Sequence, residues 1–486
     1  MTDALSTPVT DIPLVVDLDG TLIATDLLYE AGSASLIGSP ASALHMAGWL
    51  KRGRSTLKRE LTARVELDYA VLPFRHEVIE WLRAERAAGR RLILASASDR
   101  HAVQGVADHL GLFDEVFGST PESNLRSEAK RDLLVERFGP RGFDYVGNSS
   151  HDLPVWEAAR VAHVVSDSAS LRAKAAERAE LGRTFGPGRR RGPLRAWLKS
   201  IRIHQWSKNA LVVLPLLLAH RLGHVDDIVS ALVAFVSFSL TASSVYVLND
   251  LADVENDRHH HKKRTRPFAA GDLSLAAGWV SWPLLALAGL GLAFLLPLPY
   301  LAVLLTYLTL TTLYTFALKQ LPVVDVVTLA LLYTLRIVAG SAALDLALSN
   351  WLLTFSMFIF LGLAMTKRVS ELTRIRRELS GAAKGRGYVE ADLELLSMVG
   401  VSSSIASVLT FALFVQDGTT IGLYKTPGAL WMSVPVLLGW LLRVWLLAHR
   451  GELDEDPILF AIKDRVSLVL GAVVGVIFLF AMLVAV

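Results

Sequence analysis

The chain has 486 residues, of which 52% are hydrophobic and 20% charged, with a formal net charge of +3. Its mean hydropathy of +0.42 is too high for a protein that is soluble throughout. There is no cysteine, which excludes a disulfide framework and a thiolate metal site. The N-terminus is polar and runs directly into a strand-like segment, so we expect no secretory signal peptide.

Residues 1–185 predict a soluble α/β domain. Strand-like runs at 14–16, 92–95 and 145–146 alternate with helical patterns, which is typical of a doubly wound parallel sheet. Polar residues follow these runs, and ligands bind at the carboxyl ends of such strands. The candidate site residues are Asp17, Asp19, Ser96, Lys130, Asn148 and Asp152.

This set of side chains suits phosphoryl transfer through an aspartyl phosphate. Asp17 would be the nucleophile and Asp19 the general acid and base. Ser96 and Lys130 would hold the phosphoryl oxygens. The expected Mg²⁺ ligands are Asp17, Asp19, Asn148 and Asp152.

The Asp-x-Asp-Gly-Thr motif at 17–21, with the later elements in order, resembles the haloacid dehalogenase superfamily of phosphatases over roughly residues 10–175. The resemblance implies that the helical insert at about 22–90 is a cap. The last motif of that family usually begins with an acid, whereas this chain has Asn148, which is neutral but still offers an oxygen. An active phosphatase is therefore one prediction, and a non-catalytic regulatory domain is the alternative.

A basic linker with an interfacial helix is expected at residues 186–203. Glycine, proline and arginine residues at its start break regular structure. Leu194, Trp197, Leu198 and Ile201 then recur at helical spacing among basic residues, as in a helix that lies on an anionic membrane surface. A helix that packs between domains is the alternative.

Residues 204–486 predict an all-α membrane domain, because apolar segments of about 20 residues recur along them. We expect about nine transmembrane helices, centred near Val213, Phe238, Pro283, Leu305, Leu332, Phe358, Ala406, Leu438 and Val474. Basic residues gather after the second, sixth and eighth spans. The positive-inside rule then places these loops and the N-terminal domain in the cytoplasm, with the protein in a bacterial inner membrane.

An acidic motif follows the second predicted span. Asp250, Asp253 and Asp257 come after Asn249 and recur at i, i+3 and i+7, which places them on one helix face. Such carboxylates repel one another unless cations separate them, and their oxygens suit Mg²⁺ with bound phosphates. A basic run follows, with Lys263, Arg264 and Arg266. The pattern predicts a site that ionises a diphosphate leaving group; a solvated helix end is the alternative.

Nine spans with this motif at a cytoplasmic mouth resemble the UbiA superfamily of intramembrane prenyltransferases, from about residue 195 onwards. That family normally carries a second acidic motif after the sixth span, where this chain has Lys367, Arg368 and Glu371. The basic replacement is similar to the decaprenyl-phosphate phosphoribosyltransferase branch, as are segments 202–209, 454–457 and 463–465. This resemblance implies Mg²⁺-dependent transfer of 5-phosphoribose from phosphoribosyl pyrophosphate to polyprenyl phosphate.

The same resemblance implies the residues that bind the two substrates. Lysine and arginine among them would meet the sugar 5-phosphate and the lipid phosphate. The candidates are Gln205, Lys208, Asn209, Asn249, Lys263, Arg264, Arg266, Arg336, Lys367, Arg368, Glu371, Asp464 and Arg465. The N-terminal domain would then remove the 5-phosphate from the lipid product.

Two other functions remain open on the sequence. One is an aromatic prenyltransferase that uses a polyprenyl diphosphate; the other is a transporter or lipid-binding scaffold with an inactive phosphatase fold. The histidines at 259–261 are adjacent and do not converge on one ion, so they predict a polar loop. Apolar periodicity around Trp197 and Trp206 favours a membrane over nucleic acid. The sequence predicts neither an isoprenoid length nor an oligomeric state.

Overall fold

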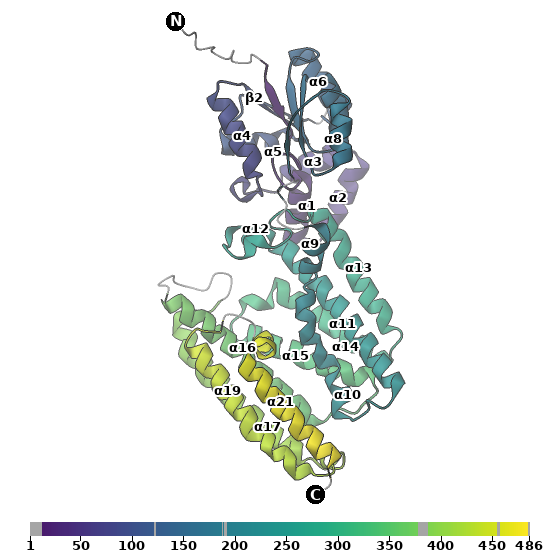
Figure 1. The fold of residues 1–486 in the computed structure, drawn as a ribbon, viewed down its shortest axis with the longest axis vertical. Helices are drawn as coiled ribbons and strands as arrows, with labels where there is room; N and C mark the ends of the chain where they lie inside the picture. Colours follow the sequence, from purple (N-terminus) through teal and green to yellow (C-terminus); the bar gives the residue numbers. More distant parts are fainter. Residues whose placement is uncertain are drawn as a thin grey trace. The chain divides into compact units, whose positions relative to one another are not determined.

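The computed structural model describes residues 12–120, 123–186, 188, 192–377, 387–453 and 457–484. The chain forms two compact units (Figure 1). Unit 1 consists of Met1–Ile201 and Tyr246–Ser281, and unit 2 of Arg202–Val245 and Trp282–Val486. The segment that carries the acidic motif thus belongs to unit 1, together with the predicted phosphatase domain.

Unit 1 is built on a six-stranded sheet in the order β3-β2-β1-β4-β5-β6. The strands are β1 (Leu14–Val16), β2 (Leu92–Asp99), β3 (Glu115–Ser119), β4 (Asp144–Gly147), β5 (Val161–Val165) and β6 (Glu180–Phe185). All neighbouring strands run parallel; Val15 of β1 pairs with Ile93 of β2 and with Tyr145 of β4. The predicted doubly wound parallel sheet is confirmed.

Each face of this sheet has its own hydrophobic core, because successive side chains of a strand point to opposite faces. Leu14 and Val16 pack into one cluster and Val15 into the other. The helices that follow the strands are α4 (His76–Ala87), α5 (Arg100–Leu110), α6 (Glu128–Phe138), α7 (Leu153–Ala158) and α8 (Ala169–Ala176). This two-sided burial explains why the strands read as continuous apolar runs.

The insert between β1 and β2 is helical, as predicted. Helices α1 (Leu27–Gly38), α2 (Ser42–Lys51) and α3 (Arg54–Thr62) pack around Trp49 and Leu61. Helix α4 also lies in the predicted cap interval, but its Val78 and Trp81 join the core on the sheet. The separate cap therefore consists of α1 to α3.

The predicted linker helix is present as α9 (Pro193–Ser200) in unit 1. Its Ala196 is buried, whereas Leu194, Trp197 and Leu198 are exposed. Exposed aromatic and aliphatic side chains on one face are typical of a helix at a membrane surface.

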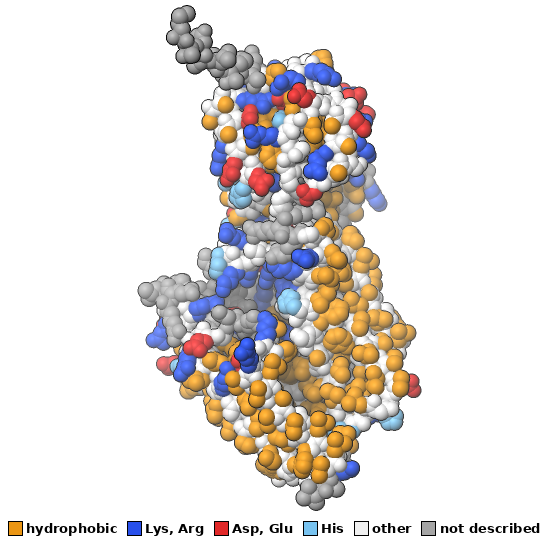
Figure 2. All heavy atoms as spheres, viewed as in Figure 1, with side chains coloured by type: hydrophobic (Ala, Val, Ile, Leu, Met, Phe, Trp, Pro, Cys, Tyr) orange, Lys and Arg blue, Asp and Glu red, His pale blue; other side chains and the backbone are white. Residues whose placement is uncertain are grey.

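The described residues of unit 2 form α-helices and short 3₁₀-helices. Eight helices among the described residues are long and apolar enough to cross a membrane. They are α11 (Val225–Ala252), α13 (Leu275–Ala293), α14 (Leu298–Phe316), α15 (Val324–Ala343), α16 (Asn350–Arg377), α17 (Leu393–Gln416), α19 (Ser433–His449) and α21 (Arg465–Leu483), of which α11 and α13 have one end in unit 1. Hydrophobic side chains cover much of the surface of unit 2 in Figure 2, as lipid contact requires.

Eight of the about nine predicted spanning helices are present, whereas the first predicted span is not a continuous helix. The segment around Val213 consists of a 3₁₀-helix η3 (Ile203–Val212) and a five-residue helix α10 (Leu214–Leu218). Pro215 lies at the start of α10, where a proline is tolerated only because no helical donor is required there. Neither piece has the length of a spanning helix, so apolar composition alone was a poor guide here.

This broken segment runs antiparallel to α11 within unit 2. Trp206 Nε1 donates to Ser243 Oγ at 3.0 Å, and Asn209 Nδ2 donates to Ser239 Oγ at 3.0 Å. Ten residues of 3₁₀-helix and five of α-helix together extend roughly 27 Å at their usual rises. The segment therefore covers most of the thickness of a bilayer core without forming one continuous helix.

Helix α15 approaches the broken segment through Gly340. A Cβ on Gly340 would lie 2.0 Å from the Val212 carbonyl oxygen, whereas a Cβ on Gly291 of α13 would meet no atom within 4 Å. We therefore expect Gly340→Ala to lower the melting temperature of the detergent-solubilised protein by several degrees. Gly291→Ala should leave it unchanged or raise it slightly, since alanine favours helix. Equal melting temperatures for the two variants would contradict this packing.

Candidate functional site

The first site of unit 1 lies at the carboxyl ends of β1 and β4. Asp17 follows β1 and is buried, with its Oδ1 2.7 Å from Nζ of Lys130 on α6. Lys130 also donates to Tyr145 Oη at 3.0 Å, and Tyr145 Oη donates to Asp152 Oδ1 at 2.8 Å. The structure thus brings three of the predicted residues into one network, to which Tyr145 is an addition that sequence reasoning missed.

Burial raises the pKa of Asp17 to about 7; Lys130 opposes this shift, while the carboxylates of Asp152 and Asp19 add to it. The pKa of Lys130 is raised, because the attraction of Asp17 and Asp152 outweighs its burial. Several carboxylates in one poorly hydrated space favour a bound divalent cation. The oxygen donors at this site therefore fit Mg²⁺.

Asn148 lies beside the motif loop. Its side chain lies so close to Gly20 (φ +75°) that a Cβ there would meet its Nδ2 at 2.1 Å. Its backbone nitrogen donates to Asp152 Oδ2 at 3.0 Å. The amide therefore occupies the place of the usual acid and offers a neutral oxygen.

Asp19 lies in a cluster of donors. Its Oδ2 accepts hydrogen bonds from Ser96 Oγ at 2.8 Å and Ser98 Oγ at 2.7 Å, and its Oδ1 accepts one from the Leu27 nitrogen at 2.9 Å. Ser96 is thus at the predicted place, although its hydroxyl binds the predicted acid. Ser98 was missed because the polar residues after Ser96 read as a loop rather than as an extension of β2.

A lysine of the cap also reaches this site. Lys58 of α3 donates to the Ala97 carbonyl oxygen and, at 3.4 Å, to Asn124 Oδ1. Burial lowers its pKa, while the negative charges of Asp19 and Asp26 oppose the change. Sequence reasoning missed Lys58 because only the packing of the cap brings α3 over the strand ends.

Mg²⁺ affinity at the Asp17 site should rise from about pH 6 to about pH 8. Below a pKa of about 7 the Asp17 carboxyl is mostly protonated, and a cation must displace that proton. The measurement is the Mg²⁺ concentration that gives half of the full increase in melting temperature. It should be made in an Asp257→Asn background, because Asp257 also has a raised pKa. Adding Asp17→Asn should remove the pH dependence. The expectation is contradicted if the half-effect Mg²⁺ concentration of the Asp257→Asn protein is the same at pH 6 and pH 8.

The second site of unit 1 is the acidic motif at the end of α11. The carboxylates of Asp250 and Asp257 both lie against Arg266, whose Nη1 is 3.2 Å from Asp250 Oδ1 and 2.7 Å from Asp257 Oδ2. Asn249 Nδ2 donates to Asp253 Oδ2 at 3.1 Å. The predicted helix face is formed, although α11 ends at Ala252 and a short helix α12 (Val254–His259) continues it.

The charges of this second site are closely balanced. Burial raises the pKa of Asp257 to about 6, against the attraction of Arg266. Burial lowers the pKa of Arg266, but Asp250 and Asp257 outweigh it, so the net shift is upward. Lys263 and Arg264 are exposed beside it. The carboxylate oxygens of the motif can bind Mg²⁺, and the neighbouring Arg266 can bind a phosphate group that comes with the ion.

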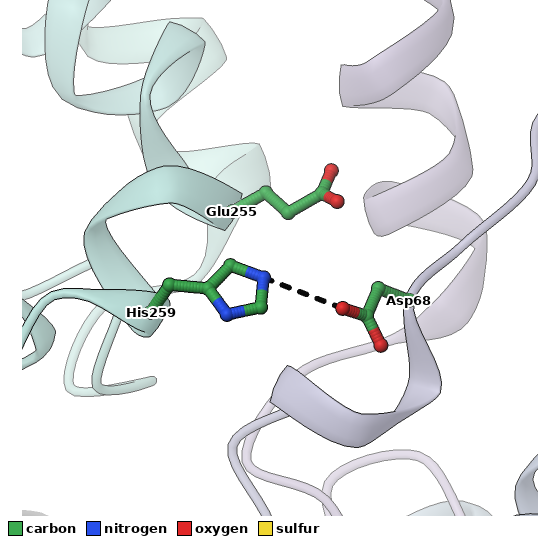
Figure 3. A group of neighbouring side chains, drawn as sticks. All are labelled: Asp68, Glu255 and His259. Atoms are coloured by element: carbon green, nitrogen blue, oxygen red, sulfur yellow. Dashed lines mark ion pairs between the residues drawn. The ribbon is translucent and has the colours of Figure 1, made fainter. Parts of the chain in front are cut away.

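Close to this motif, Asp68, Glu255 and His259 point toward one another (Figure 3). One ligand atom from each lies within 4.8 Å of the others, and His259 Nε2 is 3.3 Å from Asp68 Oδ2. All three are exposed, and exposed acids commonly gather without an ion. Of the three adjacent histidines, His259 belongs to this group, where it contacts Asp68 in the segment after α3.

In unit 2, Arg336 is buried among aromatic rings. Its Nε donates to Asn209 Oδ1 at 3.0 Å and its Nη2 to Tyr307 Oη at 3.2 Å. The guanidinium lies 5.0 Å from the ring centre of Tyr333, and the ammonium of Lys208 lies 6.0 Å from the same ring. The structure therefore brings Lys208, Asn209 and Arg336 together, as a polar group that ties η3 to α15.

Arg368 lies in a second buried network of unit 2. Its Nε donates to Asp325 Oδ2 and its Nη1 to Glu371 Oε2, each at 2.8 Å. Tyr388 donates to the other oxygen of Asp325. Asp325 and Tyr388 were missed, because neither lies near the predicted motif in sequence. Lys367, next to Arg368 on α16, is partly exposed.

The remaining predicted residues lie elsewhere in unit 2. Asp464 caps α21 and pairs with Arg443 at 2.7 Å, whereas Arg465 is exposed and Gln205 is partly exposed. Segment 454–456 lies outside the described residues. An apolar cavity of about 230 Å³ is lined by Leu211, Leu214, Ile337, Leu352, Phe355, Ser356, Ile359, Phe360, Leu363, Trp440, Ile458 and Ala461.

Two family models match the chain: the UbiA prenyltransferase family over residues 210–464 and the haloacid dehalogenase-like hydrolases over residues 14–157. The y4nM protein of Sinorhizobium fredii is 38% identical over 473 residues, 97% of this chain and 91% of that protein. The nodulation protein NoeC of Azorhizobium caulinodans is 35% identical over 295 residues, 59% of this chain and 94% of NoeC. Decaprenyl-phosphate phosphoribosyltransferase of Mycobacterium tuberculosis is 32% identical over 275 residues, 55% of this chain and 88% of that enzyme.

The UbiA match covers more than half of the 486 residues and contains the spanning helices from α11 to α19, whereas α21 lies beyond its end. The hydrolase match covers the sheet from β1 to α7 with its Asp17 network. The chain is therefore an integral membrane protein that belongs to the UbiA prenyltransferase family and carries a haloacid dehalogenase-like domain in its N-terminal part.

Proposed function

We propose that this protein transfers 5-phosphoribose from phosphoribosyl pyrophosphate to polyprenyl phosphate with release of pyrophosphate. The observation that carries this proposal is the pair Lys367 and Arg368, bases at the place where prenyltransferases of the family hold a second Mg²⁺ with acids. A monophosphate acceptor and a phosphorylated sugar require more positive charge than a prenyl diphosphate does. The 32% identity to the M. tuberculosis phosphoribosyltransferase supports the same substrates.

The acidic motif supplies the chemistry at the donor. Asp250, Asp253 and Asp257 would hold Mg²⁺, which when bound draws charge from the anomeric C–O bond as pyrophosphate leaves. The guanidinium of Arg266 lies against two of these carboxylates and can also donate two parallel hydrogen bonds to the pyrophosphate. The acceptor phosphate is ionised at neutral pH, so its attack on the sugar carbon requires no strong base.

The acceptor would be held by groups of unit 2. The ion pairs with Asp325 and Glu371 hold the Arg368 guanidinium in one orientation. The apolar cavity has the lining that an isoprenoid tail requires. Asp464 and Arg465 stay predicted binding residues; in the structure Asp464 caps α21 and pairs with Arg443.

The N-terminal domain would then hydrolyse the 5-phosphate of the lipid product to give polyprenyl-phosphoryl ribose. Asp17 attacks phosphorus while Asp19 gives a proton to the leaving ribose oxygen; water then cleaves the aspartyl phosphate, with Asp19 taking its proton. Ser96 and Lys130 hold the phosphoryl oxygens. Lys58 would meet the second phosphate of this substrate, the diester that joins ribose to lipid.

The protein would lie in a bacterial inner membrane with unit 1 in the cytoplasm. The donor is a water-soluble cytoplasmic metabolite, and the loops after α11 and α16 are basic. The exposed face of α9 would rest on the same surface.

Membranes that contain the protein, given Mg²⁺, polyprenyl phosphate and ribose-labelled phosphoribosyl pyrophosphate, should yield labelled lipid. Asp250→Asn and Asp257→Asn should lower the rate by roughly 10²-fold or more, the usual scale for loss of a preorganised electrostatic contact. Asp226→Asn is the matched control, since Asp226 is exposed in the first turn of the same helix α11.

Two outcomes would contradict the proposal. Prenylation of 4-hydroxybenzoate from a polyprenyl diphosphate, with no transfer from the sugar donor, would indicate an aromatic prenyltransferase. Full activity in both acid variants would mean that the carboxylates only end a helix.

A further inference from the structure

A buried ion pair joins the cap helix α1 to the acidic motif within unit 1. Arg258 follows Asp257 directly, and its Nη2 and Nη1 lie 2.7 Å and 3.0 Å from the two carboxylate oxygens of Glu30. The two side chains are only 6% and 4% exposed. A bidentate pair of this kind fixes both the distance and the orientation of the segments that it joins.

The pair belongs to a continuous chain of hydrogen bonds. The Glu30 carboxylate also accepts a hydrogen bond from Thr25 Oγ1 at 2.5 Å, and the Thr25 carbonyl accepts one from the Gly20 nitrogen at 3.0 Å. On the other side, Arg258 Nε donates to the Ala269 carbonyl oxygen at 3.2 Å. The loop that contains Asp17 and Asp19 is therefore connected to the helix that carries Asp257.

Other contacts hold the same two segments in register. Gly271 (φ +72°) lies against Ala24 so closely that a Cβ would meet the Ala24 Cβ at 2.6 Å. Trp279 Nε1 donates to Ser33 Oγ at 3.1 Å. The pair of His259 and Asp68 adds an exposed contact (Figure 3). The ion pair and these contacts together form an interface between α1 with its preceding loop and residues 254–279, which we call the joint. Among these contacts, only loss of Glu30 or Arg258 would leave a buried charge without its partner.

We propose that the phosphatase domain positions the acidic motif of the transferase through the Glu30–Arg258 pair. Arg258 and Glu30 are positioning residues: they touch no substrate, and they act by fixing α12 and so the carboxylate of Asp257. The inference rests on the proposed role of Asp257 at the donor site. The pair would explain why the two domains are fused, because the haloacid dehalogenase-like domain would hold the acidic motif of the UbiA domain in position.

Glu30→Gln keeps the shape of the side chain and removes its charge. In the full-length protein it should speed hydrogen–deuterium exchange across residues 254–271 and raise the Mg²⁺ concentration for half-maximal transfer by about tenfold, the lower end of the range for groups that orient metal ligands. The Michaelis constant for polyprenyl phosphate should stay within about twofold of its wild-type value, since the acceptor groups lie elsewhere. Glu60→Gln is the matched control, because Glu60 of α3 forms its ion pairs with its near neighbours Arg59 and Arg64 and not with a residue of α12.

The reversed pair, Glu30→Arg with Arg258→Glu, distinguishes positioning from general destabilisation. Exchange in 254–271 and the Mg²⁺ requirement should return toward wild type in the double variant and in neither single one. The inference is overturned if Glu30→Gln leaves both quantities unchanged, or if it speeds exchange equally in peptides of α16 and α17. A wild type without sugar transfer would refute the proposed function, while exchange in 254–271 would still test the joint.

Discussion

Removing a charge from water costs more free energy than most single contacts return, so a buried carboxylate persists only beside a cation and further donors. The sites of this protein are built around that constraint. The pairs are Asp17–Lys130, Glu30–Arg258, Asp257–Arg266 and Asp325–Arg368. In each pair the partners come from different elements, and in all but Asp257–Arg266 the paired residues are far apart in sequence, so the charges that would serve chemistry also hold distant segments together.

The same constraint relates the two sites of unit 1. Burial raises the pKa of Asp17 to about 7 and that of Asp257 to about 6, so at a pH below these values a cation would have to displace a proton from each carboxyl. Both sites suit substrates that bring phosphate together with Mg²⁺. Glu30 and Arg258 lie between them, which makes the cap helix α1 common to both.

Short-range patterns in the sequence predicted a large part of this structure. Asp17 and Asp19 lie at a strand end because β1 is apolar and Gly20 turns the chain, and both signals are local. Helical spacing predicted that the carboxylates of the acidic motif share one face, and the basic run that contains Arg266 was visible because it follows them closely in sequence. The parallel sheet followed from the alternation of strand and helix patterns.

The features that were missed depend on tertiary packing. Lys58 reaches the phosphatase site from the cap, and Glu30 lies 228 positions from Arg258 in sequence. Helix propensity and hydropathy say nothing of such pairs. The first span was mispredicted because its average hydropathy hides Lys208 and Asn209, which are buried: Lys208 lies over the Tyr333 ring, and Asn209 is hydrogen-bonded to Ser239. A single sequence indicates which residues carry charge, but not which distant partner neutralises it.

The central claim is that both halves of the chain act on one lipid in sequence. It is tested most directly with phosphoribosyl pyrophosphate labelled in the ribose with ¹⁴C and at the 5-phosphate with ³²P. The measurement is the ratio of the two labels in the extracted lipid over time. We expect both labels to enter the lipid together and ³²P then to be lost relative to ¹⁴C, whereas in Asp17→Asn the ratio should stay at its starting value. A wild-type ratio that also stays constant would contradict the claim, because the N-terminal domain would then not act on this lipid.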